Sequence, residues 1–228
     1  MRVLVFGATG MIGQGVLREC LLDERIDAVL TVGRRATGQR HAKLSELVPP
    51  DLSDLSDAVD TMAGYDACFF CLGVSSAGMS EQAYRRVTLD LTLAAARPLA
   101  VANPAMTFVY VSGAGSDATG RSRMMWARVK GETENAVLAL PFHGYAVRPG
   151  FIQPMHGIRS RTGWYRALYL ASRPLYPLMF RFAPRSATST ERMGRAMIQL
   201  ALTGASKRVL DGADINDLAD AYEAARSQ

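Results

Sequence analysis

The stretch that decides the fold is RVLVFGATGMIGQGVLRECLLDE, residues 2–24. An apolar run of strand type leads directly into a glycine-rich loop, and the loop leads into a segment whose apolar residues recur with helical spacing. Further along the chain, strand-type runs alternate with helix-type segments, as expected for a parallel sheet covered by helices on both faces. The sequence therefore predicts an α/β fold, a Rossmann-type doubly wound parallel sheet.

The predicted elements extend over most of the chain. Strands are predicted over 2–7, 28–33, 43–49, 67–73, 106–115, 144–150 and, as a short strand with a turn, within 207–215. Helices are predicted over 11–24, 55–64, 80–96, 123–140, 189–204 and 216–227. Ser80 is a candidate N-cap, and Arg97-Pro98 should kink or end the helix that Ser80 begins. Since no repeat or linker interrupts this pattern, we predict a single domain over 1–228, within which 151–188 is a variable, lid-like segment.

The composition restricts the class of protein. The chain has 228 residues, of which 49% are hydrophobic and 21% charged, enough to bury the core of one large domain. The sequence has no run of 18 or more apolar residues, so we expect no transmembrane helix. The N-terminal residues lead into a strand-type run and do not resemble a secretory signal. The three cysteines fit a reducing compartment. We therefore expect a cytoplasmic protein.

Cys68 and Cys71 have the spacing of a redox motif, but they lie in a strand-type run. Residues three apart on a strand point to opposite faces of the sheet. We therefore expect neither a disulfide nor a shared metal ion at this pair, and we predict no metal site.

Positive charge is concentrated in the second half of the chain. The net charge is +5, and residues 135–190 contain seven arginines without an Asp or Glu. Such a block suits a phosphate-bearing cofactor, another anionic ligand, a membrane surface or nucleic acid, and a solvated basic face fits it equally well. Within it, residues 159–185 interleave arginines with aromatic residues. We interpret this segment as a substrate lid with an apolar underside; membrane-surface contact and a protein partner are the alternatives, and nucleic acid is not favoured.

The loop GATGMIG at 7–13 predicts a nucleotide site. Glycines at Gly7, Gly10 and Gly13 permit a tight turn, a close approach to a pyrophosphate and close packing of the helix on the strand. The helix start beyond the loop presents free N–H groups and partial positive charge to phosphates. The remaining candidate cofactor contacts in this loop are Thr9, Met11 and Ile12.

The end of the second predicted strand indicates which nucleotide is bound. A cofactor with a free ribose 2′-OH usually meets an Asp or Glu there, but this strand ends in Arg34 and Arg35. Arginine pairs with a 2′-phosphate and stacks on adenine, so NADP(H) is favoured over NAD(H). The alternative is that both arginines are solvent-facing. Asp51 and Leu52, after the third predicted strand, are weaker candidates for adenine contacts.

Several motifs together resemble the short-chain dehydrogenase/reductase superfamily: GATGMIG, CLG at 71–73, VSGAG at 111–115, WARVKGETE at 126–134 and VRPG at 147–150. The similarity is greatest to its atypical and extended, epimerase-like members, in particular the Tat-interacting tumour-suppressor-like group. The resemblance implies cofactor contacts from Leu72, Gly73, Pro149 and Gly150. It further implies that Ser112 hydrogen-bonds a substrate carbonyl and that Lys130 grips the nicotinamide ribose.

The sequence departs from that family at Trp126. The resemblance places a catalytic Tyr at this position, four residues before the Lys, to exchange a proton with the substrate oxygen. An indole N–H donates a hydrogen bond but is not deprotonated near neutral pH, and loss of a general acid costs about 10²–10⁴-fold in rate. Water, Ser112, His156, Tyr165 or Tyr169 could supply the proton, although packing or surface roles are favoured for the last three.

Two functional classes follow from these residues. The first is an NADP-dependent oxidoreductase or epimerase-like enzyme acting on a small carbonyl or hydroxyl substrate, which the Ser112 and Lys130 pair favours. The second is a non-catalytic NADPH-binding regulator or scaffold with a protein partner, which Trp126 favours. The resemblance also implies that the chain could form a homodimer through helices flanking the sheet.

Overall fold

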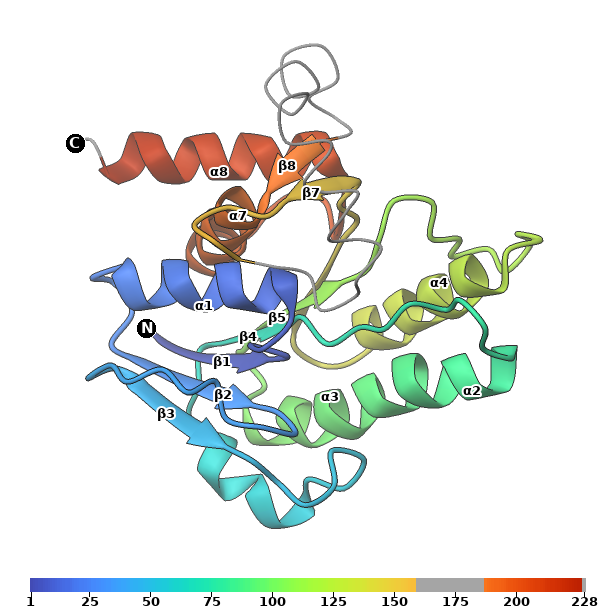
Figure 1. Ribbon diagram of the computed structural model, residues 1–228, viewed down its shortest axis with the longest axis horizontal. Helices are drawn as coiled ribbons and strands as arrows, with labels where there is room; N and C mark the ends of the chain where they lie inside the picture. Colours follow the sequence, from blue (N-terminus) through green and yellow to red (C-terminus); the bar gives the residue numbers. More distant parts are fainter. Residues whose placement is uncertain (159–186, 227–228) are drawn as a thin grey trace.

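The computed structural model of the protein describes residues 1–158 and 187–226. Its centre is a sheet of seven strands in the order β3-β2-β1-β4-β5-β6-β9, and every neighbouring pair is parallel (Figure 1). The strands are β1 (Arg2–Phe6), β2 (Ala28–Val32), β3 (Leu44–Leu47), β4 (Ala67–Phe70), β5 (Thr107–Val111), β6 (His143–Val147) and β9 (Val209–Leu210). The predicted doubly wound parallel sheet is confirmed.

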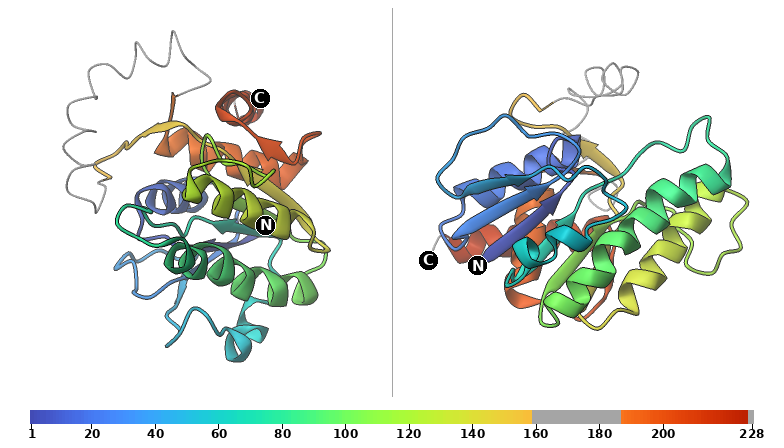
Figure 2. Two further views of the ribbon diagram at one scale, coloured as in Figure 1. Left: turned by 90° about the vertical axis from the view of Figure 1, so that its right-hand side faces the viewer. Right: turned by 90° about the horizontal axis from the view of Figure 1, so that it is seen from below.

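Helices cover both faces of this sheet (Figures 1 and 2). One face carries α1 (Met11–Leu22), α7 (Thr190–Thr203) and α8 (Gly212–Arg226); the other carries α2 (Glu81–Arg85), α3 (Leu91–Ala102) and α4 (Met125–Leu138). Successive residues of β1 point to opposite faces: Val3 and Val5 pack under α1 and α7, while Leu4 and Phe6 pack under α3. The near-continuous apolar run of this strand is thus explained, because both of its faces are buried.

The strand order fixes where a ligand can bind. From β1 the chain proceeds outward through β2 and β3, then returns to the other side of β1 and proceeds through β4, β5 and β6. The direction therefore reverses between β1 and β4. In open parallel sheets a crevice forms at such a reversal, beyond the carboxyl ends of the strands. The glycine loop after β1 and residues 71–73 after β4 lie at this crevice.

The long helix opposite α1 differs from the prediction in one respect. Ser80 is its N-cap as predicted, since the Ser80 hydroxyl accepts a hydrogen bond of 3.2 Å from the Ala83 N–H. The helix continues from α2 through a π-helical turn, η3 (Arg86–Asp90), into α3, which passes Pro98 and ends at Ala102. The helix therefore does not end at Arg97-Pro98, which was one of the two outcomes that the sequence predicted. Burial of Ala95, Ala96, Leu99 and Ala100 offsets the cost of about 3 kcal/mol that a proline brings to a helix interior.

The short helix predicted over 55–64 is a pair of 3₁₀ turns, η1 (Ser56–Ala58) and η2 (Asp60–Met62). The two thiols of the CFFC run lie on opposite faces of the sheet, as predicted. Cys68 is buried beneath α3 and Cys71 packs against the core on the α1 side. All three cysteines are free.

A second, two-stranded parallel sheet was not predicted: β7 (Phe151–Gln153) pairs with β8 (Ala187–Ser189). Strands of three residues are too short for periodicity to reveal them. Residues 159–186 lie outside the described part of the chain, so the lid, membrane-surface and partner interpretations stay predictions, as do the roles considered for Tyr165 and Tyr169. Within 1–158 and 187–226, every helix is too short or too polar to span a membrane.

Candidate functional site

The glycine loop is packed so tightly that Gly7 and Gly13 leave no room for a side chain. Gly7 has a φ of +78°, and a Cβ on Gly7 would lie 2.9 Å from the Cys71 carbonyl carbon at the end of β4. A Cβ on Gly13 would lie 2.1 Å from the Gly7 carbonyl oxygen. Gly10 is less constrained, since its Cβ would lie 3.3 Å from that oxygen. The loop therefore folds against both α1 and β4, as the nucleotide-loop prediction requires.

The start of α1 is open to an anion. Gly10 is its N-cap and supplies no side chain to the first turn, whose residues include no acid. The N–H groups of Met11, Ile12 and Gly13 belong to the turn that has no intrahelical acceptors. Gln14 braces the loop by donating from Nε2 to the Thr9 carbonyl over 3.2 Å. This end of the helix has the arrangement that binds phosphate in other proteins.

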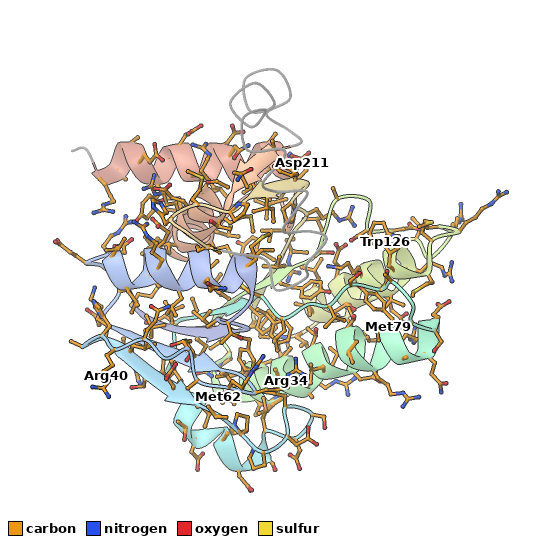
Figure 3. All side chains as sticks on the ribbon, viewed as in Figure 1. Arg34, Arg40, Met62, Met79, Trp126 and Asp211 are labelled. Carbon is orange, nitrogen blue, oxygen red and sulfur yellow. The ribbon has the colours of Figure 1, made fainter. Side chains whose placement is uncertain are left out.

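A hollow joins the loop to the end of β2. It is lined by Gly7, Ala8, Thr9, Thr31, Val32, Gly33, Arg34, Arg35, Thr37 and Leu72. Arg34 and Arg35 are exposed at its edge, and within 1–158 and 187–226 neither guanidinium pairs with a carboxylate (Figure 3 labels Arg34). The Glu46 carboxylate instead accepts hydrogen bonds of 2.6 Å and 2.5 Å from the N–H and hydroxyl of Thr37. Positive charge is thus left available at the position where the nucleotide ribose was predicted.

The adenine candidates are placed differently. Leu52 is 6% exposed and belongs to the core beneath α3. Asp51 is exposed, and its carboxylate accepts a 2.8 Å hydrogen bond from the Ser53 N–H, which lowers the pKa of Asp51. Neither residue lines the hollow. Gly73, beside Leu72, is exposed at the end of the β4 segment.

A second group of residues surrounds the loop that follows β5. The Ser112 hydroxyl is buried and lies 2.8 Å from the Ser116 hydroxyl, which also donates to the Gly113 carbonyl over 2.8 Å. The Ala114 N–H donates to the Pro149 carbonyl over 2.9 Å. The buried Pro149 and the exposed Gly150 therefore lie beside the loop that carries Ser112.

Lys130 reaches this loop from α4. Its ammonium donates a 2.9 Å hydrogen bond to the Ser112 carbonyl and is partly buried. Desolvation lowers the pKa of Lys130 from 10.5 to about 8, against the opposing attraction of Glu134 one turn along the helix. Glu134 is itself bound by Arg148. The structure thus brings Ser112 and Lys130 together, whereas their roles toward substrate and cofactor stay predictions.

Trp126 packs on the same loop. Gly115 has a φ of +87°, and a Cβ there would lie 3.2 Å from the Cη2 of the Trp126 ring. Farther along α4, a Cβ on Gly131 would lie 2.0 Å from the Asp117 carbonyl oxygen. The loop therefore lies directly on α4, in contact with Trp126 at the first turn and with Gly131 farther on. Figure 3 labels Trp126 on this helix.

His156 is engaged elsewhere. It has a φ of +53°, and its Nε2 lies 3.1 Å from the Glu191 carboxylate in the first turn of α7.

Ser116 is the residue that sequence reasoning missed. Its hydroxyl completes the surroundings of Ser112, yet a serine four residues along a loop carries no periodic signal. Within the described ranges, no group of three His, Cys, Asp or Glu could hold a metal ion.

Comparisons with known proteins agree with this geometry. The model of the NAD dependent epimerase/dehydratase family matches residues 3–124. Protein fmp52, mitochondrial, of Emericella nidulans is 32% identical over 158 residues, 66% of this chain and 66% of that protein. Protein HTATIP2 of Rattus norvegicus is 30% identical over 154 residues, 66% of this chain and 62% of that protein. These matches span less than two thirds of either relative's length, and they confirm the predicted similarity to the Tat-interacting group.

Solved structures share the fold. The oxidoreductase ylbE from Lactococcus lactis has a TM-score of 0.65 at 13% identity, covering 97% of this chain and 96% of that one. MoeE5 in complex with UDP-glucose and NAD has a TM-score of 0.66 at 19% identity, covering 100% of this chain and 82% of that one.

The expected cytoplasmic location is contradicted by these comparisons, because the FMP52 relatives are named mitochondrial. The expectation rested on composition and on the lack of an apolar run, and neither property identifies a compartment.

Proposed function

The chain belongs to the NAD dependent epimerase/dehydratase family, and from this premise we propose that it binds NADP(H) in preference to NAD(H) and transfers hydride to or from a small carbonyl or hydroxyl substrate. The observation that carries the proposal is the hollow that joins the glycine loop to Arg34 and Arg35. The start of α1 would hold the phosphates, Leu72 and the end of β2 would flank the ribose, and Arg34 and Arg35 would pair with the 2′-phosphate.

The charge balance of the hollow supports NADP(H). An acidic side chain at the end of β2 would accept hydrogen bonds from a ribose 2′-OH, but would repel a 2′-phosphate. Here Arg34 and Arg35 hold that position, and Glu46 is turned toward Thr37. A hydrogen bond to a charged group contributes about 1.5–3 kcal/mol, so we expect NADPH to bind roughly 10–100-fold more tightly than NADH.

Titration of both nucleotides, followed by heat or tryptophan fluorescence, tests the proposal. The double variant Arg34→Asp, Arg35→Asp should bind NADPH at least as weakly as the wild-type protein binds NADH. Arg40→Asp is the control, since Arg40 is exposed on the same connection but does not line the hollow (Figure 3). Equal affinity for the two nucleotides in the wild-type protein would refute the NADP(H) preference, and failure to bind either would refute the proposed function.

A second function is favoured by one observation, the packing of Trp126 on Gly115 where the family resemblance places a tyrosine. In this alternative the protein is a regulator or scaffold that binds NADPH without turnover and acts on a protein partner. A panel of aldehydes, ketones and quinones separates the two functions, because a regulator would bind NADPH tightly and oxidise it with none of them.

A further inference from the structure

Carbonyl reduction needs a proton as well as a hydride. When hydride adds to the carbonyl carbon, the π electron pair moves to the oxygen, and the alkoxide that forms must be protonated. Its conjugate acid is an aliphatic hydroxyl, whose pKa lies far above neutral pH, so a nearby acid accelerates the step strongly. The indole of Trp126 donates hydrogen bonds but does not release its proton in this pH range.

Lys130 is an acid that reaches the loop carrying the serine pair. Its Nζ donates to the Ser112 carbonyl and would lie 3.9 Å from a Cβ placed on Gly113. That hydrogen bond uses one of the three ammonium donors. The charged groups that act on it are Glu134 of α4 and, through Glu134, Arg148 directly after β6, whose two hydrogen bonds occupy that carboxylate. Within 1–158 and 187–226 the ammonium therefore forms no salt bridge, and its desolvation brings the pKa of Lys130 to about 8.

The two serine hydroxyls can orient the substrate oxygen in both the carbonyl form and the alcohol form of the substrate. The Ser116 hydroxyl donates to the Gly113 carbonyl, so Ser112 donates to Ser116 and keeps its lone pairs for a substrate hydroxyl. When a carbonyl substrate binds, Ser112 turns its proton to that oxygen and Ser116 turns its own to Ser112. The Gly113 carbonyl remains satisfied, because the Ser116 N–H also donates to it over 3.1 Å.

We propose that Lys130 is the catalytic proton donor of this site, and that Ser116 is a positioning residue that sets the hydrogen-bonding direction of Ser112. The proposal rests on the proposed function, since NADPH supplies the hydride. In the reduction, the C–H bond of NADPH breaks and a C–H bond to substrate forms. An N–H bond of the Lys130 ammonium then breaks as the substrate O–H bond forms. The products are NADP⁺, the alcohol and a neutral lysine, which solvent reprotonates.

The first test measures the acid itself and requires no substrate. The chain contains three lysines, Lys43, Lys130 and Lys207, so dimethylation with ¹³C-formaldehyde should give three lysine resonances by NMR. Lys130→Arg and Lys207→Arg assign them. The Lys130 resonance should titrate near pH 8. A midpoint at the free-lysine value of about 10.4 would overturn the proposal.

The second test separates proton donation from a role in gripping the cofactor. At saturating NADPH, 4-nitrobenzaldehyde and 9,10-phenanthrenequinone are compared as acceptors. Hydride addition to the aldehyde carbon yields an alkoxide, whereas the quinone accepts the hydride on a carbonyl oxygen and yields the phenolate of an aromatic diol. The conjugate acid of that phenolate has a pKa near 10, so water can protonate it. Lys130→Arg keeps the charge but cannot release a proton. It should lose about 10²–10⁴-fold in aldehyde reduction, while quinone reduction changes less than about tenfold.

The aldehyde rate constant kcat/KM should also fall as pH rises through about 8, as the lysine loses its proton. Ser116→Ala should lower aldehyde turnover about tenfold without moving that midpoint, and Ser116→Thr should restore it. Equal loss with both acceptors in Lys130→Arg would make the lysine a cofactor contact alone and overturn the assignment. Tight NADPH binding without turnover of either acceptor would overturn it and favour the regulator, whereas absent NADPH binding would refute the proposed function itself.

Discussion

Arg148, directly after β6, holds Glu134 of α4 through two hydrogen bonds, 2.9 Å from Nε to Oε1 and 2.5 Å from Nη2 to Oε2. Glu134 is fully buried, and the side chain of Arg148 is 25% exposed. The pair joins the helix that carries Lys130 to the strand that leads into Pro149. Arg148 also occupies the Glu134 carboxylate, which would otherwise neutralise Lys130 one helical turn away.

Breaking this pair should destabilise the fold. Glu134→Gln leaves a partly buried guanidinium without its charged partner, and we expect a loss of about 2–4 kcal/mol in the free energy of unfolding, measured by urea denaturation. Glu132→Gln is the matched control, because Glu132 lies on the same helix but pairs with Arg85 of α2 at the exposed surface; it should cost less than about 1 kcal/mol. If the two variants lost equal stability, the buried pair would have no special role. Because Glu134 opposes the desolvation of Lys130, Glu134→Gln should also lower the pKa of Lys130 further.

Lys130 itself should cost stability at neutral pH. Its folded pKa of about 8 lies below the unfolded value of 10.5, so the unfolded chain binds more protons between these values and stability rises with pH across that window. The full cost is present below pH 8. Lys130→Met should therefore stabilise the protein at pH 7, by about 1–3 kcal/mol after discounting for partial exposure. The variant's stability should lack the rise between pH 8 and 10.5. A destabilised Lys130→Met would show that the ammonium supports the fold.

Gly131 should tolerate no side chain. A Cβ would lie 2.0 Å from the Asp117 carbonyl oxygen, so Gly131→Ala must displace the loop after β5 from α4, at a cost of about 1–3 kcal/mol. The fluorescence of Trp126, which packs on that loop, should change with it. Gly73→Ala serves as the control for stability, because a Cβ on Gly73 would meet open space. A Gly131→Ala variant as stable as Gly73→Ala would contradict this packing.

Trp126→Tyr should increase turnover. A phenol one helical turn before Lys130 adds a second acid beside the ammonium, and we expect 4-nitrobenzaldehyde reduction to rise about tenfold or more over wild type. Trp126→Phe removes the indole without adding an acid and should not raise the rate. If both variants respond alike, the change comes from space in the pocket and not from acid–base chemistry.

The strand–loop–helix unit at the N-terminus was determined by the sequence alone, because its signals are local. Glycine spacing and apolar periodicity act within a few residues, and they correctly predicted the parallel sheet and the tight packing of the loop at Gly7 and Gly13. The Ser80 cap is a local signal of the same kind. The same is true of the CFFC thiols, whose opposite orientation follows from strand geometry.

Only the tertiary structure decided the relationships that depend on which segments meet. Ser116 becomes a hydrogen-bond partner of Ser112 because the loop after β5 packs on α4. The Glu134 carboxylate binds Arg148 because β6 brings Arg148 beside that helix. Pro98 stays within α3 because burial of its neighbours outweighs its local preference. In each case the deciding energy comes from contacts between residues distant in sequence, to which local pattern and propensity do not respond.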